Sequence, residues 1–128
     1  MKTFHTVGLS VLAGAGLGAV AVQTLQAQAT PPIYQITEID VSNVDAYLKE
    51  YAPKAQAAIK AAGGRFLAAG MKVTSIEGDP PKSRVAVIAW DNMEKLQAYR
   101  NSAVFKEIRP IGDKYAKFRG FTVEGLPQ

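Results

Sequence analysis

Residues 84–90 form the most strongly patterned stretch of the chain, with five consecutive apolar residues at its centre. Three of these five residues are β-branched, a composition that is typical of strands. A strand that is apolar at every central position has no face suited to water, so we predict a central strand buried on both sides. A loop rich in Gly, Asp and Pro precedes it at residues 78–83, and a helix-start signal follows at residues 91–94.

The pattern upstream of the central strand predicts another strand and then a long helix. Residues 33–40 are rich in β-forming side chains that alternate between two faces. Ser42, followed three residues later by Asp45, resembles a capping box and predicts the start of the helix. Apolar residues then recur at spacings of three and four as far as Ala62, which predicts an amphipathic helix.

Proline and glycine interrupt and end this helix. Pro53 supplies no backbone donor and clashes with the preceding turn, so we expect a kink or break next to it. Residues 63–64 are both glycine and end the helix, because glycine adopts the left-handed cap at little steric cost. Residues 65–69 then form a strand, which we expect to bend at Gly70 and to continue through residues 72–77 into a hairpin with the central strand.

The last third of the chain predicts further helical segments and a final strand. Asp91 and Glu94 are the expected caps of a second helix, with Met93, Leu96 and Tyr99 facing inward. The remaining expected elements are a break at Asn101 and Ser102, a helical turn over residues 103–108, a short helix over residues 110–117 that starts at Pro110, and a strand over residues 118–124.

The order of these elements predicts an α+β domain of the ferredoxin-like βαββαβ type, with a four-stranded antiparallel sheet. Its two helices cover only one face of the sheet, although the central strand is apolar on both sides. An exposed apolar face of this size requires a partner. We therefore expect a homodimer in which the sheets of two copies close into a dimeric α/β barrel.

The first 29 residues differ from the rest of the chain. Lys2 is the only charged residue before Glu38, residues 7–22 are almost entirely apolar or small, and residues 27–29 form a small-x-small motif. This pattern predicts a signal peptide over residues 1–29 that is cleaved after Ala29, and hence a periplasmic or secreted domain over residues 30–128. The alternative is an uncleaved N-terminal anchor, but the apolar run is short for a membrane span.

Composition narrows the chemistry that the domain can perform. The chain of 128 residues has no cysteine and carries a net charge of +4. Without Lys2 and His5, the remainder has 14 basic and 11 acidic residues, a net charge of +3, and no histidine. This mild charge does not predict a nucleic-acid surface. Without histidine and cysteine the domain lacks the commonest metal and haem ligands, so we expect no metal site and no cofactor.

Several linked motifs resemble a known family. They are residues 63–67 (Gly-Gly-Arg-Phe-Leu), residues 77–81 (Glu-Gly-Asp-Pro-Pro), residues 83–88 (Ser-Arg-Val-Ala-Val-Ile) with Trp90, and the later Tyr99, Ser102 and Phe105. Together they are similar to the bacterial domain-of-unknown-function family DUF1330, in the dimeric α/β-barrel superfamily. The resemblance covers nearly all of residues 33–125. It implies the fold and the dimer, but it supplies no catalytic residues.

Two groups of residues are candidates for a binding site. Arg65 and Arg84 begin neighbouring strands, where a guanidinium group could bind a carboxylate. The alternative is that they form structural pairs with Glu77, Asp79 or backbone carbonyls. An aromatic pocket could be lined by Tyr34, Trp90, Tyr99 and Phe105; the alternative is that these rings belong to the core. Tyr47 and Tyr51 are interpreted as a helix edge or dimer rim.

These observations favour an exported homodimeric domain that binds a small apolar or aromatic molecule with an anionic end. The ligand is expected where the aromatic group meets Arg65 or Arg109. Two alternatives remain open: a cofactor-independent small monooxygenase or isomerase, by analogy of fold, and a structural protein without a ligand site.

Overall fold

Four antiparallel strands build the sheet of the computed structural model, which describes residues 30–127. The strands are β1 (Ile33–Val41), β2 (Arg65–Gly70), β3 (Arg84–Trp90) and β4 (Ala116–Glu124). Their order across the sheet is β2-β3-β1-β4, and the described helices and strands belong to the unit Pro32–Gly125. The expected signal peptide over residues 1–29 lies outside the described residues.

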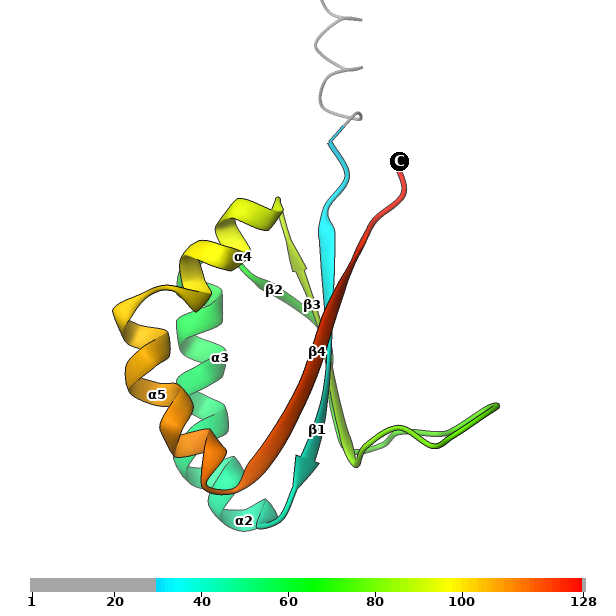
Figure 1. Ribbon diagram of the computed structural model, residues 1–128, viewed down its shortest axis with the longest axis vertical. Helices are drawn as coiled ribbons and strands as arrows, with labels where there is room; N and C mark the ends of the chain where they lie inside the picture. Colours follow the sequence, from blue (N-terminus) through cyan, green and yellow to red (C-terminus); the bar gives the residue numbers. More distant parts are fainter. Residues whose placement is uncertain (1–29, 128) are drawn as a thin grey trace, which may run out of the picture. The chain divides into compact units, whose positions relative to one another are not determined.

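The helical segments of this unit lie on one face of the sheet (Figure 1). They are α2 (Val44–Ala46), η1 (Tyr47–Tyr51), α3 (Ala52–Ala61), α4 (Met93–Arg100) and α5 (Ala103–Asp113). No helix among residues 30–127 covers the opposite face, and the sheet is open (Figure 1). The predicted ferredoxin-like α+β fold with its four-stranded antiparallel sheet is confirmed.

The core lies between the sheet and the helices in two clusters. One is built around Ile39 of β1, with Tyr47, Tyr51 and Ile108 packed against it. The other is built around Trp90 of β3, whose exposed fraction is 0%. Because each fully buried large apolar side chain contributes about 1.5–3 kcal/mol, these two clusters account for much of the stability of the fold.

The first helical region changes its hydrogen-bonding pattern just before Pro53, as the sequence predicts. The N–H of Ala52 donates to the carbonyl of Tyr47 five residues back, so η1 is a π-helical turn. Pro53 follows in the first turn of α3, where its missing N–H costs little. The rings of Tyr47 and Tyr51 lie 5.4 Å apart. Gly63, with a φ of +105°, follows the end of α3 in the left-handed region that favours glycine.

The residues that cap two helices differ from those predicted. Asn43, rather than Ser42, caps α2, because its side chain accepts a backbone N–H of the first turn at 3.1 Å. The Ser42 hydroxyl instead donates to the carbonyl of Tyr115. Asn92, rather than Asp91, caps α4 in the same way at 2.9 Å. In both cases two cap-forming residues are adjacent, and the sequence pattern does not distinguish them.

The prediction of a separate helix that starts at Pro110 is wrong. Helix α5 runs without interruption from the Ser102 cap to Asp113, with Pro110 inside it. The proline is exposed and stands one turn before the end of the helix, so it removes one backbone hydrogen bond without forcing a break. The predicted break at Asn101 and Ser102 between α4 and α5 is confirmed.

The segment between β2 and β3 is a protruding arm rather than an extension of the hairpin (Figure 1). The prediction of strand structure over residues 72–77 is wrong, because residues 71–83 contain no strand. Pro80 and Pro81 lie opposite this stretch and have no N–H to donate, so a regular ladder cannot form there. Ile76 on the arm is 95% exposed.

Candidate functional site

A cavity of about 80 Å³ lies between the sheet and the helices. Its floor is a row of small residues that the strand register places side by side: Ala69 of β2 pairs with Ala86 of β3, Ala86 with Thr37 of β1, and Thr37 with Gly120 of β4. Neighbouring rows carry larger side chains such as Ile88. The short side chains of this row leave a trough beneath the helices, and the cavity lies over Ala69, Ala86 and Thr37.

Arg84 contributes a buried positive charge to this cavity. It is the first residue of β3, its side chain lines the cavity, and the residue is only 9% exposed. None of the ion pairs among residues 30–127 includes Arg84. Its guanidinium group lies 5.6 Å from the centre of the Tyr47 ring. Arginine is rarely buried without an acidic partner, so Arg84 is the most unusual side chain of the site.

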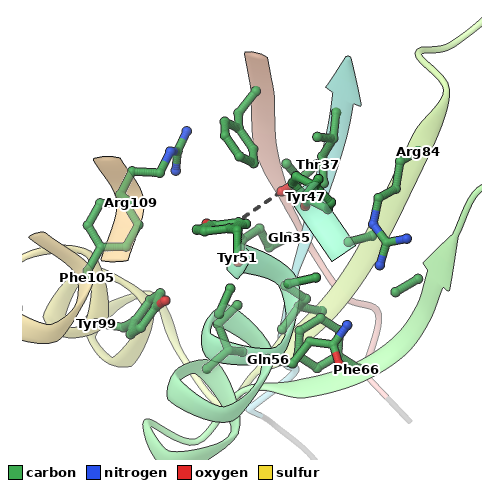
Figure 2. A pocket seen from close by; sticks show the side chains of 18 of the residues that line it. Gln35, Thr37, Tyr47, Tyr51, Gln56, Phe66, Arg84, Tyr99, Phe105 and Arg109 are labelled. Carbon is green, nitrogen blue, oxygen red and sulfur yellow. Dashed lines mark hydrogen bonds between the residues drawn. The ribbon is translucent and has the colours of Figure 1, made fainter. Parts of the chain in front are cut away.

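Arg109 contributes a second positive charge from the opposite side of the cavity (Figure 2). It extends from α5, and its guanidinium carbon lies 3.8 Å from the centre of the Phe118 ring. Its Nε–H donates to Asp113 at 3.1 Å, and the Arg109 side chain is 24% exposed. Because this contact uses only the Nε–H, the two terminal amino groups of the guanidinium remain available to another acceptor.

Three tyrosines lie around these arginines. Burial raises the pKa of Tyr47 and Tyr99, and it raises the pKa of Tyr51 to about 12. The positive charge of Arg109 opposes this effect on the pKa of all three, and Arg84 opposes it on the pKa of Tyr47. The three hydroxyl groups are therefore protonated at neutral pH and can donate hydrogen bonds to a ligand.

A chain of hydrogen bonds fixes one end of the cavity floor. The buried indole Nε1–H of Trp90 donates to Gln35 Oε1 at 2.9 Å, and Gln35 Nε2–H donates to Thr37 Oγ1 at 3.5 Å. Gln35 and Thr37 both line the cavity, whereas Trp90 lies behind them. Trp90 thus acts on the cavity by holding Gln35 in place.

The structure brings four of the six predicted site residues together. The Trp90 ring stacks on Tyr99 at 5.8 Å, and the Tyr99 ring meets the edge of Phe105 at 5.4 Å. Tyr99, Phe105 and Arg109 line the cavity (Figure 2). Tyr34 pairs with Ala89 and points to the uncovered face of the sheet. Its hydroxyl is therefore separated from the cavity by the sheet itself.

Arg65 also lies outside the cavity. Its Nη1–H donates to Asp91 at 2.8 Å, and both side chains are about half exposed. Hydrogen bonds from Lys95 and Arg65 hold the pKa of the Asp91 carboxyl below its usual value. Arg65 therefore forms a structural ion pair, with Asp91 rather than with Glu77 or Asp79.

Tyr47, Tyr51 and Arg100 are among the lining residues that the sequence analysis did not assign to a binding site. The two tyrosines are buried in the core rather than placed at a dimer rim. The sequence does indicate that Tyr47 and Tyr51 are buried, because both lie on the apolar stripe of their helix, and this stripe faces the sheet. Arg84 was a candidate carboxylate ligand together with Arg65, and the structure places it at the cavity without an acidic partner among the described residues.

The fold and the site define a ferredoxin-like α+β domain with a cavity lined by arginine and tyrosine. The family model described as Domain of unknown function (DUF1330) matches residues 32–126, and the chain belongs to this family. No curated protein matches the chain. Residues 30–127 contain no cluster of three or more acidic, histidine or cysteine side chains that could hold a metal ion.

Two solved structures illustrate the fold. A protein of unknown function from Rhodopseudomonas palustris has a TM-score of 0.64 and 11% identity, with 83% of this chain and 94% of that chain covered. A conserved protein of unknown function from Bacteroides thetaiotaomicron, described as a possible oxidoreductase, has a TM-score of 0.50 and 16% identity; 74% of this chain and 98% of that chain are covered. At these identities the similarity concerns the fold alone.

Proposed function

We propose that the domain binds a small organic anion, with a carboxylate held by Arg84 and Arg109 in the cavity. The observation that carries this proposal is the burial of Arg84 without an acidic partner. A guanidinium group that is largely shielded from solvent gains most from an anion that offers two acceptor atoms in one plane. A bound carboxylate would supply the missing partner.

The charges on the cavity wall support an anionic ligand. Of the described residues that line the cavity, Arg84, Arg100 and Arg109 are positively charged and none is Asp or Glu. The positive potential is therefore not neutralised by the wall itself, apart from the contact of Arg109 with Asp113. Alanine, isoleucine and phenylalanine side chains complete the wall and suit the apolar part of such a ligand.

The tyrosines favour binding over proton abstraction. A general base must be unprotonated near the working pH, whereas burial holds the pKa of Tyr51 at about 12. A protonated hydroxyl instead donates a hydrogen bond to a carboxylate oxygen. We therefore assign Tyr51 and its neighbour Tyr47 the role of hydrogen-bond donors to the bound anion.

Calorimetric titration of the wild type and Arg84→Met with acetate, propionate and benzoate tests the proposal. Wild type should bind at least one of these anions, and the substitution should weaken that binding by about 1.5–3 kcal/mol, because a charged hydrogen bond is lost. The stability of Arg84→Met in anion-free buffer should not fall, because the substitution removes a buried charge and keeps an apolar stem.

Arg65→Met is the matched control, since Arg65 is exposed, lies outside the cavity and undergoes the same chemical change. It should leave the affinity for every anion unchanged. Equal affinities of Arg84→Met and the wild type would contradict the proposal, as would the failure of all three anions to bind the wild type.

We further propose that the domain acts as a homodimer joined through the uncovered face of its sheet. Side chains that point to this face include Tyr34, Ile36, Val85, Val87, Phe121 and Val123. Phe121 and Val123 are 46% and 53% exposed. An apolar sheet face of this kind is typically covered by another layer, and a second copy offers a surface of the same shape and chemistry.

The proposed location of this dimer is the periplasm or the exterior of the cell. The support is the signal-peptide pattern of residues 1–29. Within residues 30–127, no helix has the length and apolar character that crossing a membrane requires. Intact-mass measurement of the protein from the cell envelope should show a chain that begins at Thr30. A full-length mass there would contradict cleavage.

A further inference from the structure

We infer that the anion site extends into a neighbouring groove and that its ligand is a short linear dicarboxylate. This inference rests on the proposed binding of a carboxylate in the cavity. The cavity of about 80 Å³ is small beside the roughly 300–1,000 Å³ of typical ligand pockets, so it suits one carboxylate and a few carbon atoms. A groove of about 650 Å³ adjoins it.

The cavity and the groove adjoin each other at shared lining residues. Gln35 and Arg100 line both of them. The row of small residues that forms the cavity floor ends at Gly120 on β4, and Gly120 lines the groove. The absence of a side chain at Gly120 therefore leaves the end of the trough open towards the space between α4 and β4.

A pair of arginines spans the junction between the two spaces. The guanidinium carbon of Arg109, in the cavity, lies 5.5 Å from the centre of the Phe105 ring. That of Arg100, which also lines the groove, lies 4.9 Å from the same centre. The two positive charges therefore cannot be farther apart than the sum of these two distances. They flank one aromatic ring, and Arg100 forms none of the ion pairs found among residues 30–127.

The chemistry of the groove matches a second carboxylate. Arg100 is its only charged lining residue among those described, and Gln97, Asn101 and Thr122 add polar groups that can donate hydrogen bonds. One carboxylate of the ligand would lie between Arg84 and Arg109, and the other would reach Arg100. The short carbon chain between them would pass beside Phe105.

Titration of the wild type with succinate, glutarate and adipate, each against the monocarboxylate of equal chain length, tests this inference. At least one dicarboxylate should bind about tenfold or more tightly than its monocarboxylate, because it contacts a third arginine. Arg100→Gln should remove this difference by lowering the affinity for the dicarboxylate more than the affinity for the monocarboxylate, because Arg100 lines the groove as well as the cavity.

Gly120→Leu provides a second, steric test that leaves all three arginines in place. A Cβ at Gly120 would lie 3.5 Å from Thr37 Oγ1, an ordinary contact, so the fold should tolerate the substitution. The added side chain would fill the mouth of the groove and should also remove the preference for the dicarboxylate. Ala57→Leu adds similar bulk at an exposed position of α3 outside the cavity and the groove. This control variant should bind the dicarboxylate and the monocarboxylate with the affinities of the wild type.

The outcomes separate this inference from the proposed function. Wild-type protein that binds monocarboxylates and dicarboxylates equally well would overturn the inference alone, as would an equal loss of both affinities in Arg100→Gln. Wild-type protein that binds neither class would overturn the proposed function, and the inference with it.

Discussion

At the scale of single residues, the site combines a buried cation with hydroxyl groups that keep their protons. Arg84 is buried without an acid, and Tyr51 is buried beside the positive charge of Arg109. Burial disfavours the charged form of Tyr51, whereas the guanidinium group of an arginine is always charged in proteins. The site therefore keeps its positive charge while its tyrosines stay neutral.

This arrangement makes the stability of the fold sensitive to high pH. The pKa of Tyr51 is raised from 10.0 to about 12, so the folded state retains a proton that the unfolded state has already lost above pH 10. The stabilisation is complete below pH 10 and is lost as the pH rises towards 12. For Tyr51 alone the loss in the free energy of unfolding should be about 2–3 kcal/mol.

Urea unfolding at a series of pH values would measure this loss, and the ultraviolet absorbance of the phenolate would report the titration itself. Tyr51→Phe should flatten the dependence of stability on pH between 10 and 12. A variant with the same steep dependence as the wild type would show that Tyr51 is not the group responsible.

At the scale of elements, a β-bulge sets the face on which β2 contributes to the site. The register between β2 and β3 shifts between Phe66 and Ala68, so Leu67 is the extra residue. If Leu67 paired with Val87 in a regular ladder, Ala68 would pair with Ala86 and Ala69 would point away from the helices. The bulge thus completes the row of small residues under the cavity.

The sequence predicts which elements form more reliably than it predicts where they begin and end. All four strands of the sheet were predicted from β-forming patterns, because the patterns report which faces are buried. The helix caps were misplaced by one residue at Ser42 and Asp91, where two capable side chains are adjacent. Pro110 predicts a helix start, but it lies within the last turn of α5, where the loss of one backbone hydrogen bond does not force a break.

The sequence also predicted part of the candidate site, namely the residues that lie on helices. Tyr99, Phe105 and Arg109 lie on helices whose periodicity shows which side faces the sheet. Tyr34 and Arg65 lie on strands, where the pattern does not reveal which face the helices cover. Arg84 required knowledge of its surroundings, because a sequence does not show that an arginine lacks a partner.

At the scale of the whole molecule, the uncovered face of the sheet is the surface through which we propose that two copies join. Val87 lies near its centre, on a central strand, next to Ile36 on β1 and Ala68 on β2. Analytical ultracentrifugation at micromolar concentration should therefore report twice the mass of one chain. Val87→Lys should convert the protein to a monomer, because a buried lysine charge would have no partner in the interface.

Ala57→Lys is the control, since it introduces the same charge on an exposed helix position on the covered side of the sheet. It should leave the dimer intact. Wild-type protein that sediments as a monomer would contradict the proposed dimer and would leave the apolar face without an explanation.

The pairing of β1 with β4 also determines when the domain can fold during its synthesis. Ile33 of β1 pairs with Glu124 of β4, and Gly125 N–H donates to the Pro32 carbonyl at 2.8 Å. Contacts between residues so distant in sequence form slowly, because the entropy of closing a long loop is lost before the contacts stabilise the fold. The sheet cannot be completed until β4 has been synthesised. A chain that is still unfolded when its synthesis ends can be carried across a membrane before it folds.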